Sequence, residues 1–193
     1  DKKALDAYDA VVLDAPPTGR IAQFLNVNSE VSGLAKMGPI RNHADLVMSV
    51  IASPRTAVHL VTLLEEMPVQ ETIDGVAELR AAELPVGSII VNMTRPPMLT
   101  EDELAQARTR SLDAGPIEAA LARAGLGSQA GALLPALVDE AEDHARRVAL
   151  EGREIERLLE LGLPTITLPF IPSGIDLGAL YELSALLGEG GLR

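Results

Sequence analysis

The chain has 193 residues, of which 47% are apolar and 23% charged, and its formal net charge is −12. This length suits one ordinary globular domain with a sizeable core. The acidic charge argues against a nucleic-acid partner and against an anionic membrane surface, since both require clustered Lys and Arg. No apolar run approaches the roughly 20 residues of a membrane span, and we expect no signal peptide. With no Cys, thiolate metal sites and disulfides are excluded, and we expect a cytoplasmic protein.

Four short apolar runs predict β-strands, at residues 10–13, 57–61, 86–91 and 164–168. The runs are mostly continuous rather than alternating, which is typical of parallel strands covered on both faces. Helical patterns separate them: a helix near Pro68, a capping box from Thr100 to Glu103, a long charged stretch at 130–161, and a last helix at 176–187. This alternation predicts a single α/β domain with a doubly wound, mostly parallel sheet and a helical insertion before the last strand.

The residues that follow the strands are the first candidates for chemistry, because ligands of doubly wound sheets bind beyond the carboxyl ends of the strands. Asp14 follows the first predicted strand. A carboxylate in this place is a common magnesium ligand of nucleotide hydrolases, but it can equally serve as a turn residue that accepts backbone hydrogen bonds. The local pattern leaves both interpretations open.

The segment from Tyr8 to Arg20, with its Asp-Ala-Pro-Pro-Thr-Gly-Arg, resembles the second switch of the ArsA/Get3 family of ATPases. Further matches follow in the family's order along nearly the whole chain: a strand leading into Pro-Val-Gln-Glu-Thr at 68–72, a strand ending in Asn92, and Leu-Pro-Phe-Ile-Pro at 168–172. The resemblance is strongest to the actinobacterial, anion-transporting ATPase-like branch. It implies a P-loop NTPase-like fold of the SIMIBI type, of which residues 1–193 would be the carboxy-terminal part of one ATPase domain.

The resemblance also implies ATP and magnesium as cofactors and assigns roles to residues. Asp14 would hold magnesium through water, and Pro17, Thr18 and Gly19 would form the switch that senses the γ-phosphate. The catalytic residues would be Asp14, Thr18 and Gly19. Asn92 would read the adenine edge, although a strand-end turn residue is the alternative. The apolar walls of the base pocket would be Pro169, Phe170 and Ile171, and for Phe170 simple core packing is the alternative.

The chain also departs from the family pattern. It begins at Asp1 without Met, and we therefore expect that the sequence starts partway through a longer protein. It also lacks the phosphate-binding loop, Gly-x-x-x-x-Gly-Lys-Ser/Thr, and the family's first switch, so we expect that residues 1–193 do not hydrolyse ATP alone. The sheet should be incomplete on its amino-terminal side, leaving Val11–Leu13 and Leu60–Val61 facing a gap instead of a neighbouring strand. Arginine, isoleucine and glutamine replace the His, Thr and Arg of the family switch, at positions 20, 21 and 23. The lack of Cys argues against a thiol-based arsenite site and a zinc-bridged dimer.

Two functions fit these features. In the first, the chain is part of an ATPase that binds ATP and hydrolyses it to ADP. This cycle would open and close a homo- or heterodimer with a related subunit, and the motion would drive transport or client handling. In the second, it belongs to a non-catalytic chaperone or regulatory subunit that keeps the fold. Residues 37–51 carry Met and aliphatic side chains suited to an apolar client, but core packing explains them too. A dinucleotide-binding domain is disfavoured, since no Gly-rich turn follows a strand.

Overall fold

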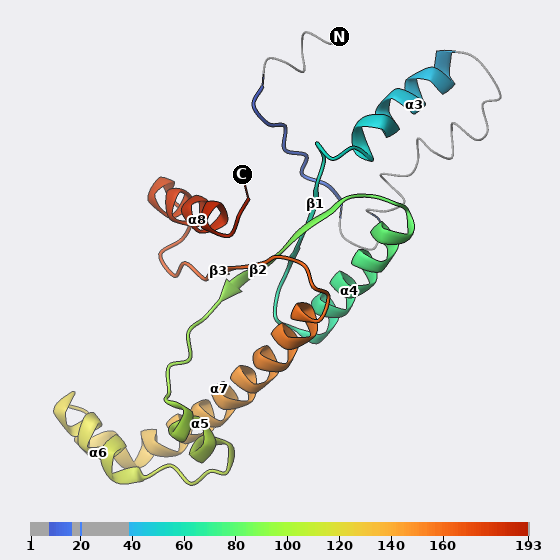
Figure 1. Cartoon of the computed structure of the whole chain (residues 1–193). Helices are drawn as coiled ribbons and strands as arrows, with labels where there is room; N and C mark the ends of the chain where they lie inside the picture. The colour runs from blue at the N-terminus through green and yellow to red at the C-terminus, as the bar shows by residue number, and fades with distance from the viewer. Residues whose placement is uncertain (1–7, 17–19, 21–38, 193) are drawn as a thin grey trace. The chain divides into compact units, whose positions relative to one another are not determined.

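The computed structural model describes residues 8–16, 20 and 39–192. Three strands are found in the described ranges: β1 (Val58–Thr62), β2 (Val86–Thr94) and β3 (Thr165–Pro169). Helices alternate with them along the chain (Figure 1): α3 (Pro39–Ile51), α4 (Glu66–Ala81), α5 (Glu101–Arg108), α6 (Ala114–Arg123), α7 (Ala130–Leu159) and α8 (Leu177–Glu189), with a short 3-10 turn at Gly127–Gln129. The strands predicted at 57–61, 86–91 and 164–168 are therefore confirmed, and so is the α/β class.

The strands form one sheet in the order β1-β2-β3. β2 and β3 run parallel, with Ile89 opposite Thr165 and Val91 opposite Thr167. Parallel neighbours require a crossover connection. Here the helical insertion of α5, α6 and α7 is that connection, so the insertion lies where the sequence placed it.

Burial differs between the central strand and the two edge strands. In β2 four successive residues, Ser88–Val91, are buried, as expected for a strand covered on both faces. Val61 in β1 is 60% exposed, and Thr167 in β3 is exposed. The expectation of two covered faces is therefore wrong for the edge strands, where exposed and buried residues alternate.

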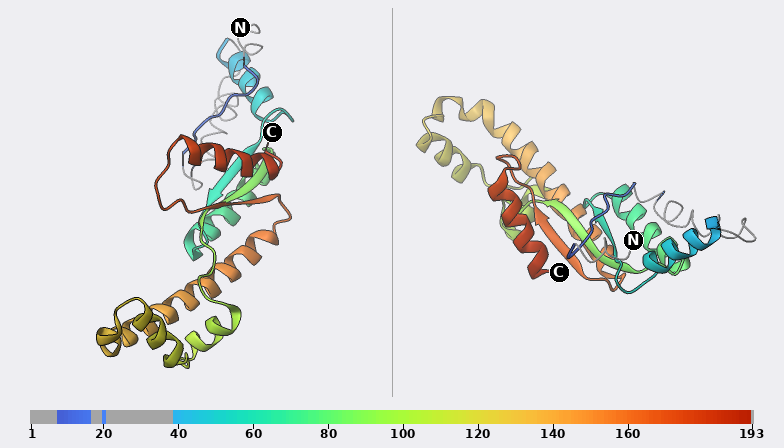
Figure 2. Two further views of the ribbon diagram at one scale, coloured as in Figure 1. Left: turned by 90° about the vertical axis from the view of Figure 1, so that its left-hand side faces the viewer. Right: turned by 90° about the horizontal axis from the view of Figure 1, so that it is seen from above.

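Helix α8 covers one face of the sheet at β2 and β3. Ile90, Ile166 and Leu168 form a buried apolar cluster, and the α8 residues that pack against it are Leu183, Leu186 and Leu187. Figure 2 shows α8 lying over the sheet beside β2 and β3. Asp176 caps the helix by accepting a hydrogen bond from the Ala179 N–H at 2.8 Å, which satisfies one of the free donors of the first turn.

The predicted strand at 10–13 is not formed. Residues 10–16 have no regular secondary structure, and Val11, Val12 and Leu13 are 76%, 93% and 65% exposed. The physical reason is that a strand exists only by hydrogen bonding to a neighbour, and the described sheet consists of β1, β2 and β3 alone. A β-branched sequence is not sufficient without such a partner.

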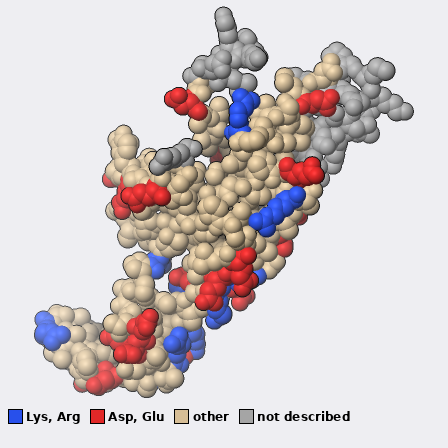
Figure 3. Space-filling view, in the orientation of Figure 1, with Lys and Arg blue, Asp and Glu red and all other residues tan. Residues whose placement is uncertain are grey.

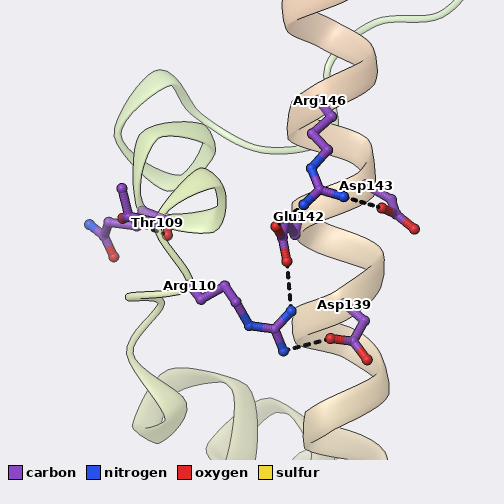
Figure 4. A network of polar contacts seen from close by, with 7 residues as sticks. Thr109, Arg110, Asp139, Glu142, Asp143 and Arg146 are labelled. Carbon is purple, nitrogen blue, oxygen red and sulfur yellow. Dashed lines mark hydrogen bonds and ion pairs between the residues drawn. The ribbon is translucent and has the colours of Figure 1, made fainter.

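The insertion is held together by apolar packing and by a surface network of charges. Leu104 and Ala107 of α5 are buried against Ala145 of α7. Beside this contact, the Arg110 guanidinium donates to Asp139 and Glu142 of α7, each at 2.6 Å (Figure 4). These carboxylates raise the pKa of Arg110. Figure 3 shows acidic and basic side chains interspersed over this part of the chain.

The capping box predicted at Thr100 is confirmed at the start of α5. The Thr100 side chain accepts from the Glu103 N–H, and the Glu103 carboxylate accepts from the Thr100 N–H at 2.8 Å. The backbone N–H and the hydroxyl of Thr100 both donate to the Glu103 carboxylate, and they lower the pKa of Glu103 because they favour its charged form. At the other end of the insertion, just after α7, Gly162 has φ +65°, a left-handed conformation that is common where helices end.

Close contacts divide the chain into two compact units. The first contains residues 1–60 and 70–87, and the second contains residues 61–69 and 88–193. Asp14 and α3 belong to the first unit, whereas the carboxyl ends of β2 and β3 and the whole insertion belong to the second. None of the helices in the described ranges is both long and apolar enough to cross a membrane.

Candidate functional site

The carboxyl ends of β2 and β3 are joined by Thr94, the last residue of β2. Its hydroxyl donates to the Leu168 carbonyl at 3.1 Å, and its own carbonyl accepts from the Phe170 N–H at 2.8 Å. Thr94 also lies opposite Pro169 in the strand register. The segments leaving the two strands are therefore fixed beside each other, at the sheet edge where α/β proteins bind ligands.

A bulge lies just before this junction. The register of β2 against β3 shifts between Val91 and Thr94, and Met93 has φ +58°, in the left-handed region that residues with a side chain rarely adopt. The Asn92 side chain supports this conformation because its Oδ1 accepts the Met93 N–H at 2.9 Å. Bulges and left-handed residues are enriched next to functional sites, where they redirect side chains. No local pattern signals this bulge, since neither Asn92 nor Met93 is Gly.

Asn92 opens onto a shallow hollow of about 130 Å³ within the second unit. Its lining comes from the segment after β1, the end of β2 and helix α7, namely Leu63, Leu64, Glu65, Asn92, Met93, Thr94, Arg95, Arg147 and Glu151. Pockets that enclose a drug-sized ligand measure roughly 300–1,000 Å³, so this hollow suits only one part of a nucleotide. Two Arg and two Glu line it, and these charges compensate each other. The balance fits a neutral base better than a phosphate chain.

Arg95 stands between this hollow and the segment after β3. Its guanidinium carbon lies 4.2 Å from the centre of the Phe170 ring, well within the distance for a cation–π contact. Arg95 is exposed and lines the hollow, whereas Phe170 is half-buried and is not among the lining residues. Sequence reasoning missed Arg95, although its position directly after a parallel strand was a signal that could have identified it.

The structure brings part of the predicted site together. Asn92 lies two residues before the end of β2, so the strand continues beyond the position at which the sequence predicted its end. Pro169, Phe170 and Ile171 lie at and after the end of β3, and all four residues belong to the second unit. The Asn92 Oδ1 accepts the N–H of the next residue, a local contact of the kind that a turn residue makes, so both interpretations of Asn92 stay open. This contact occupies one lone pair of Oδ1, and within the described residues the Nδ2 amino group has no hydrogen-bond partner. The side chain therefore retains a donor and an acceptor for a ligand.

The predicted switch lies in the first unit. Asp14 is exposed, in the segment without regular secondary structure. Pro17, Thr18 and Gly19 lie outside the described residues. Within the ranges that the structure describes, no three His, Asp or Glu side chains gather into a metal site. Magnesium in nucleotide enzymes is held by one or two carboxylates together with substrate phosphates, so the role of Asp14 stays a prediction.

The segment proposed for an apolar client, residues 37–51, contains α3 in the first unit. Leu46 is 63% exposed, whereas Val47, Met48, Val50 and Ile51 are half-buried. Met37 lies outside the described residues. This burial is intermediate between a core helix and a free apolar surface, so both interpretations of the segment stay open.

Comparison with known proteins adds independent information. The whole chain is 45% identical over 193 residues to ATPase BagA of Mycobacterium tuberculosis, and equally to a Mycobacterium bovis protein that is provisionally named an ATPase. These relatives are named as ATPases. The match covers 56% of each relative, so the chain spans about half the length of the curated relatives it matches. No family model matches the chain.

Proposed function

We propose that this chain is the nucleotide-binding part of an ATPase of the ArsA/Get3 type, and that the carboxyl ends of β2 and β3 hold the adenine base. The observation that carries the proposal is the Asn92 side chain at the mouth of the hollow, with an amino donor and one carbonyl lone pair still available. Adenine presents a neighbouring donor and acceptor on one edge, and an Asn carboxamide matches that pair with two hydrogen bonds.

The ATPase names of the relatives support the activity, because the similarity extends over all 193 residues. The motif at Asp14 supports a magnesium site. In this proposal Asp14 holds magnesium through water, and the backbone of Pro17, Thr18 and Gly19 responds to the γ-phosphate. When bound, magnesium would neutralise charge on the transferring phosphoryl group. The phosphate loop that such chemistry requires is not among residues 1–193.

The α/β fold and its parallel β2–β3 pair are consistent with a doubly wound sheet of the P-loop, SIMIBI type. We further propose a cytoplasmic dimer with a second copy or a related subunit, whose opening and closing follows the nucleotide. An apolar client would bind at residues 37–51, where Leu46 is the most exposed of the described aliphatic side chains. Transport or client handling would then be driven by the nucleotide cycle.

The experiment that tests the adenine site compares two substitutions of Asn92 in the full-length protein. Asn92→Ala removes both the turn contact and the base contact, whereas Asn92→Asp keeps an oxygen that accepts the Met93 N–H and replaces the amino donor with a second, negatively charged acceptor. We expect both variants to bind ADP more weakly, by roughly 1–3 kcal/mol, because a buried base edge loses its partner. Titration calorimetry with ADP and GDP measures this, with thermal unfolding as the control for the fold.

We expect the wild-type protein to bind ADP more tightly than GDP, and we expect Asn92→Asp to lose this selectivity. If the Asp variant keeps wild-type affinity and selectivity while Asn92→Ala unfolds, Asn92 serves only the turn. If the wild-type protein binds neither nucleotide, a non-catalytic chaperone or regulatory subunit becomes the better interpretation.

A further inference from the structure

The surface that a base would meet inside the hollow is Arg95 rather than Phe170. The sequence motif assigned Phe170 to the wall of the base pocket, but in the structure the lining residue is Arg95, and Phe170 contacts the guanidinium instead. Arg95 and Asn92 both line the hollow and are separated by only two residues at the bulged end of β2. A base held by the Asn92 carboxamide would therefore lie near the guanidinium.

The guanidinium is chemically suited to this position. It is planar, more weakly hydrated than an ammonium group, and stacks on aromatic faces. Nucleic-acid bases stack on Arg planes as they do on aromatic rings. Within the described residues Arg95 makes no ion pair, so neither of the two Glu that line the same hollow engages its guanidinium.

The backbone that carries the Phe170 ring is held in place independently of Arg95. The Phe170 N–H donates to the Thr94 carbonyl, and the Thr94 hydroxyl donates to the Leu168 carbonyl, so the two strand ends fix the position from which the half-buried ring projects. The ring in turn limits the conformations of the long Arg95 side chain, which otherwise has many rotamers to lose when a ligand binds. Phe170 would then act through Arg95.

We propose that Arg95 is the stacking platform for the nucleotide base and that Phe170 is a positioning residue that holds the guanidinium flat against the hollow. The inference rests on the proposed adenine site and specifies how that site holds the base. It makes Arg95 a binding residue that no sequence motif of the chain identifies.

The test is a double-mutant cycle in the full-length protein with ADP as the probe. Arg95→Met keeps the length of the side chain and removes the charged plane, and Phe170→Leu removes the ring. We expect Arg95→Met to weaken ADP binding roughly threefold to tenfold. In the Arg95→Met background, Phe170→Leu should cause no further loss, because a positioning residue has nothing left to position.

Inorganic pyrophosphate, which has no base, is the second probe. Its affinity should be unchanged in Arg95→Met, which separates base stacking from a phosphate contact. Arg95→Lys should not restore ADP binding because it lacks the plane, and Phe170→Tyr should retain it because it keeps the ring. Arg108→Met, on the exposed surface of α5, is the matched control for the loss of one positive charge.

Three results would overturn the inference. One is wild-type ADP affinity in Arg95→Met, and another is an equal loss of pyrophosphate binding in that variant. The third is a Phe170→Leu effect that adds fully to the Arg95→Met effect, since the ring would then contact the base itself. Should Phe170→Leu fail to fold, Phe170→Tyr and the pyrophosphate comparison still decide. If the wild-type protein does not bind ADP, the proposed function fails along with the inference. If the wild-type protein binds ADP and the Arg95 variants bind it equally well, the inference alone fails.

Discussion

The guanidinium carbon of Arg95 lies 4.2 Å from the centre of the Phe170 ring, so a residue that follows β2 is held by a residue that follows β3. An exposed contact of this kind is worth about 0.5–1 kcal/mol, too little to stabilise the fold noticeably. Its importance is geometric. It places a flat cation at the edge of the hollow that Asn92 opens onto, and so joins two strand ends into one candidate site.

The role of Asp14 is tested by replacing its carboxylate with an amide. If Asp14 holds magnesium through water, Asp14→Asn in the full-length protein should lower kcat for ATP hydrolysis by on the order of 10²-fold or more. Asp9→Asn is the matched control, since Asp9 is also exposed and lies in the same segment. Steady-state phosphate release measures both. Near-normal turnover in Asp14→Asn would show that Asp14 is a turn residue.

Residues 1–193 by themselves should release no phosphate from ATP. Phosphoryl transfer depends on a loop and a Lys that position and neutralise the phosphates, and these residues contain no Gly-x-x-x-x-Gly-Lys motif. A phosphate-release assay on the purified 193-residue polypeptide checks this. Magnesium-dependent turnover that disappears in Asp14→Ala would contradict the prediction.

Gly87 should not tolerate a side chain, because it faces His59 across the first unit. A Cβ at Gly87 would lie 2.6 Å from His59 Cε1 and 2.7 Å from Nδ1, closer than real contacts. We expect Gly87→Ala to lower the free energy of unfolding by about 1–3 kcal/mol through this overpacking. Urea denaturation of the variant measures the loss.

Two further variants control for that loss. The pair Gly87→Ala with His59→Ala should recover part of it, because the second change removes the ring that clashes. Gly152→Ala, in α7 with open space around the added Cβ, should instead stabilise the protein by roughly 0.5–1 kcal/mol. A loss in Gly87→Ala that His59→Ala does not relieve would mean that the clash is not its cause.

The stability of the protein should depend on pH through His59. Partial burial lowers the pKa of His59 below its ordinary value of 6.5, because it disfavours the charged imidazole. Between the lowered folded value and 6.5 the unfolded chain binds more protons than the folded chain, so stability rises with pH. We therefore expect the free energy of unfolding to fall as the pH is lowered from 6.5, and to be unaffected by this group above it. Denaturation at several pH values measures the free energy of unfolding of the wild type and of His59→Gln, and we expect the wild type to depend more on pH below 6.5. Equal pH dependence in the two proteins would show that His59 titrates identically in the folded and unfolded states.

The sequence by itself determined the elements whose signals are local. The apolar runs at 57–61, 86–91 and 164–168 became strands, and the Thr100 capping box begins α5 as its side chains require. Helix spacing and caps act within a few residues, so they can be read without knowing the fold. Asn92, near the end of β2, was identified through the family resemblance instead, and its role stays a prediction.

Only the tertiary structure decided the rest. Residues 10–13 have the composition of a strand but lack strand structure, because strand formation depends on a partner that a local pattern does not reveal. The left-handed Met93 arises from the register of β2 against β3, which single-residue preferences would not predict. The stacking of Arg95 on Phe170 joins residues 75 positions apart (170 minus 95), and only the pairing of the two strands brings them into contact.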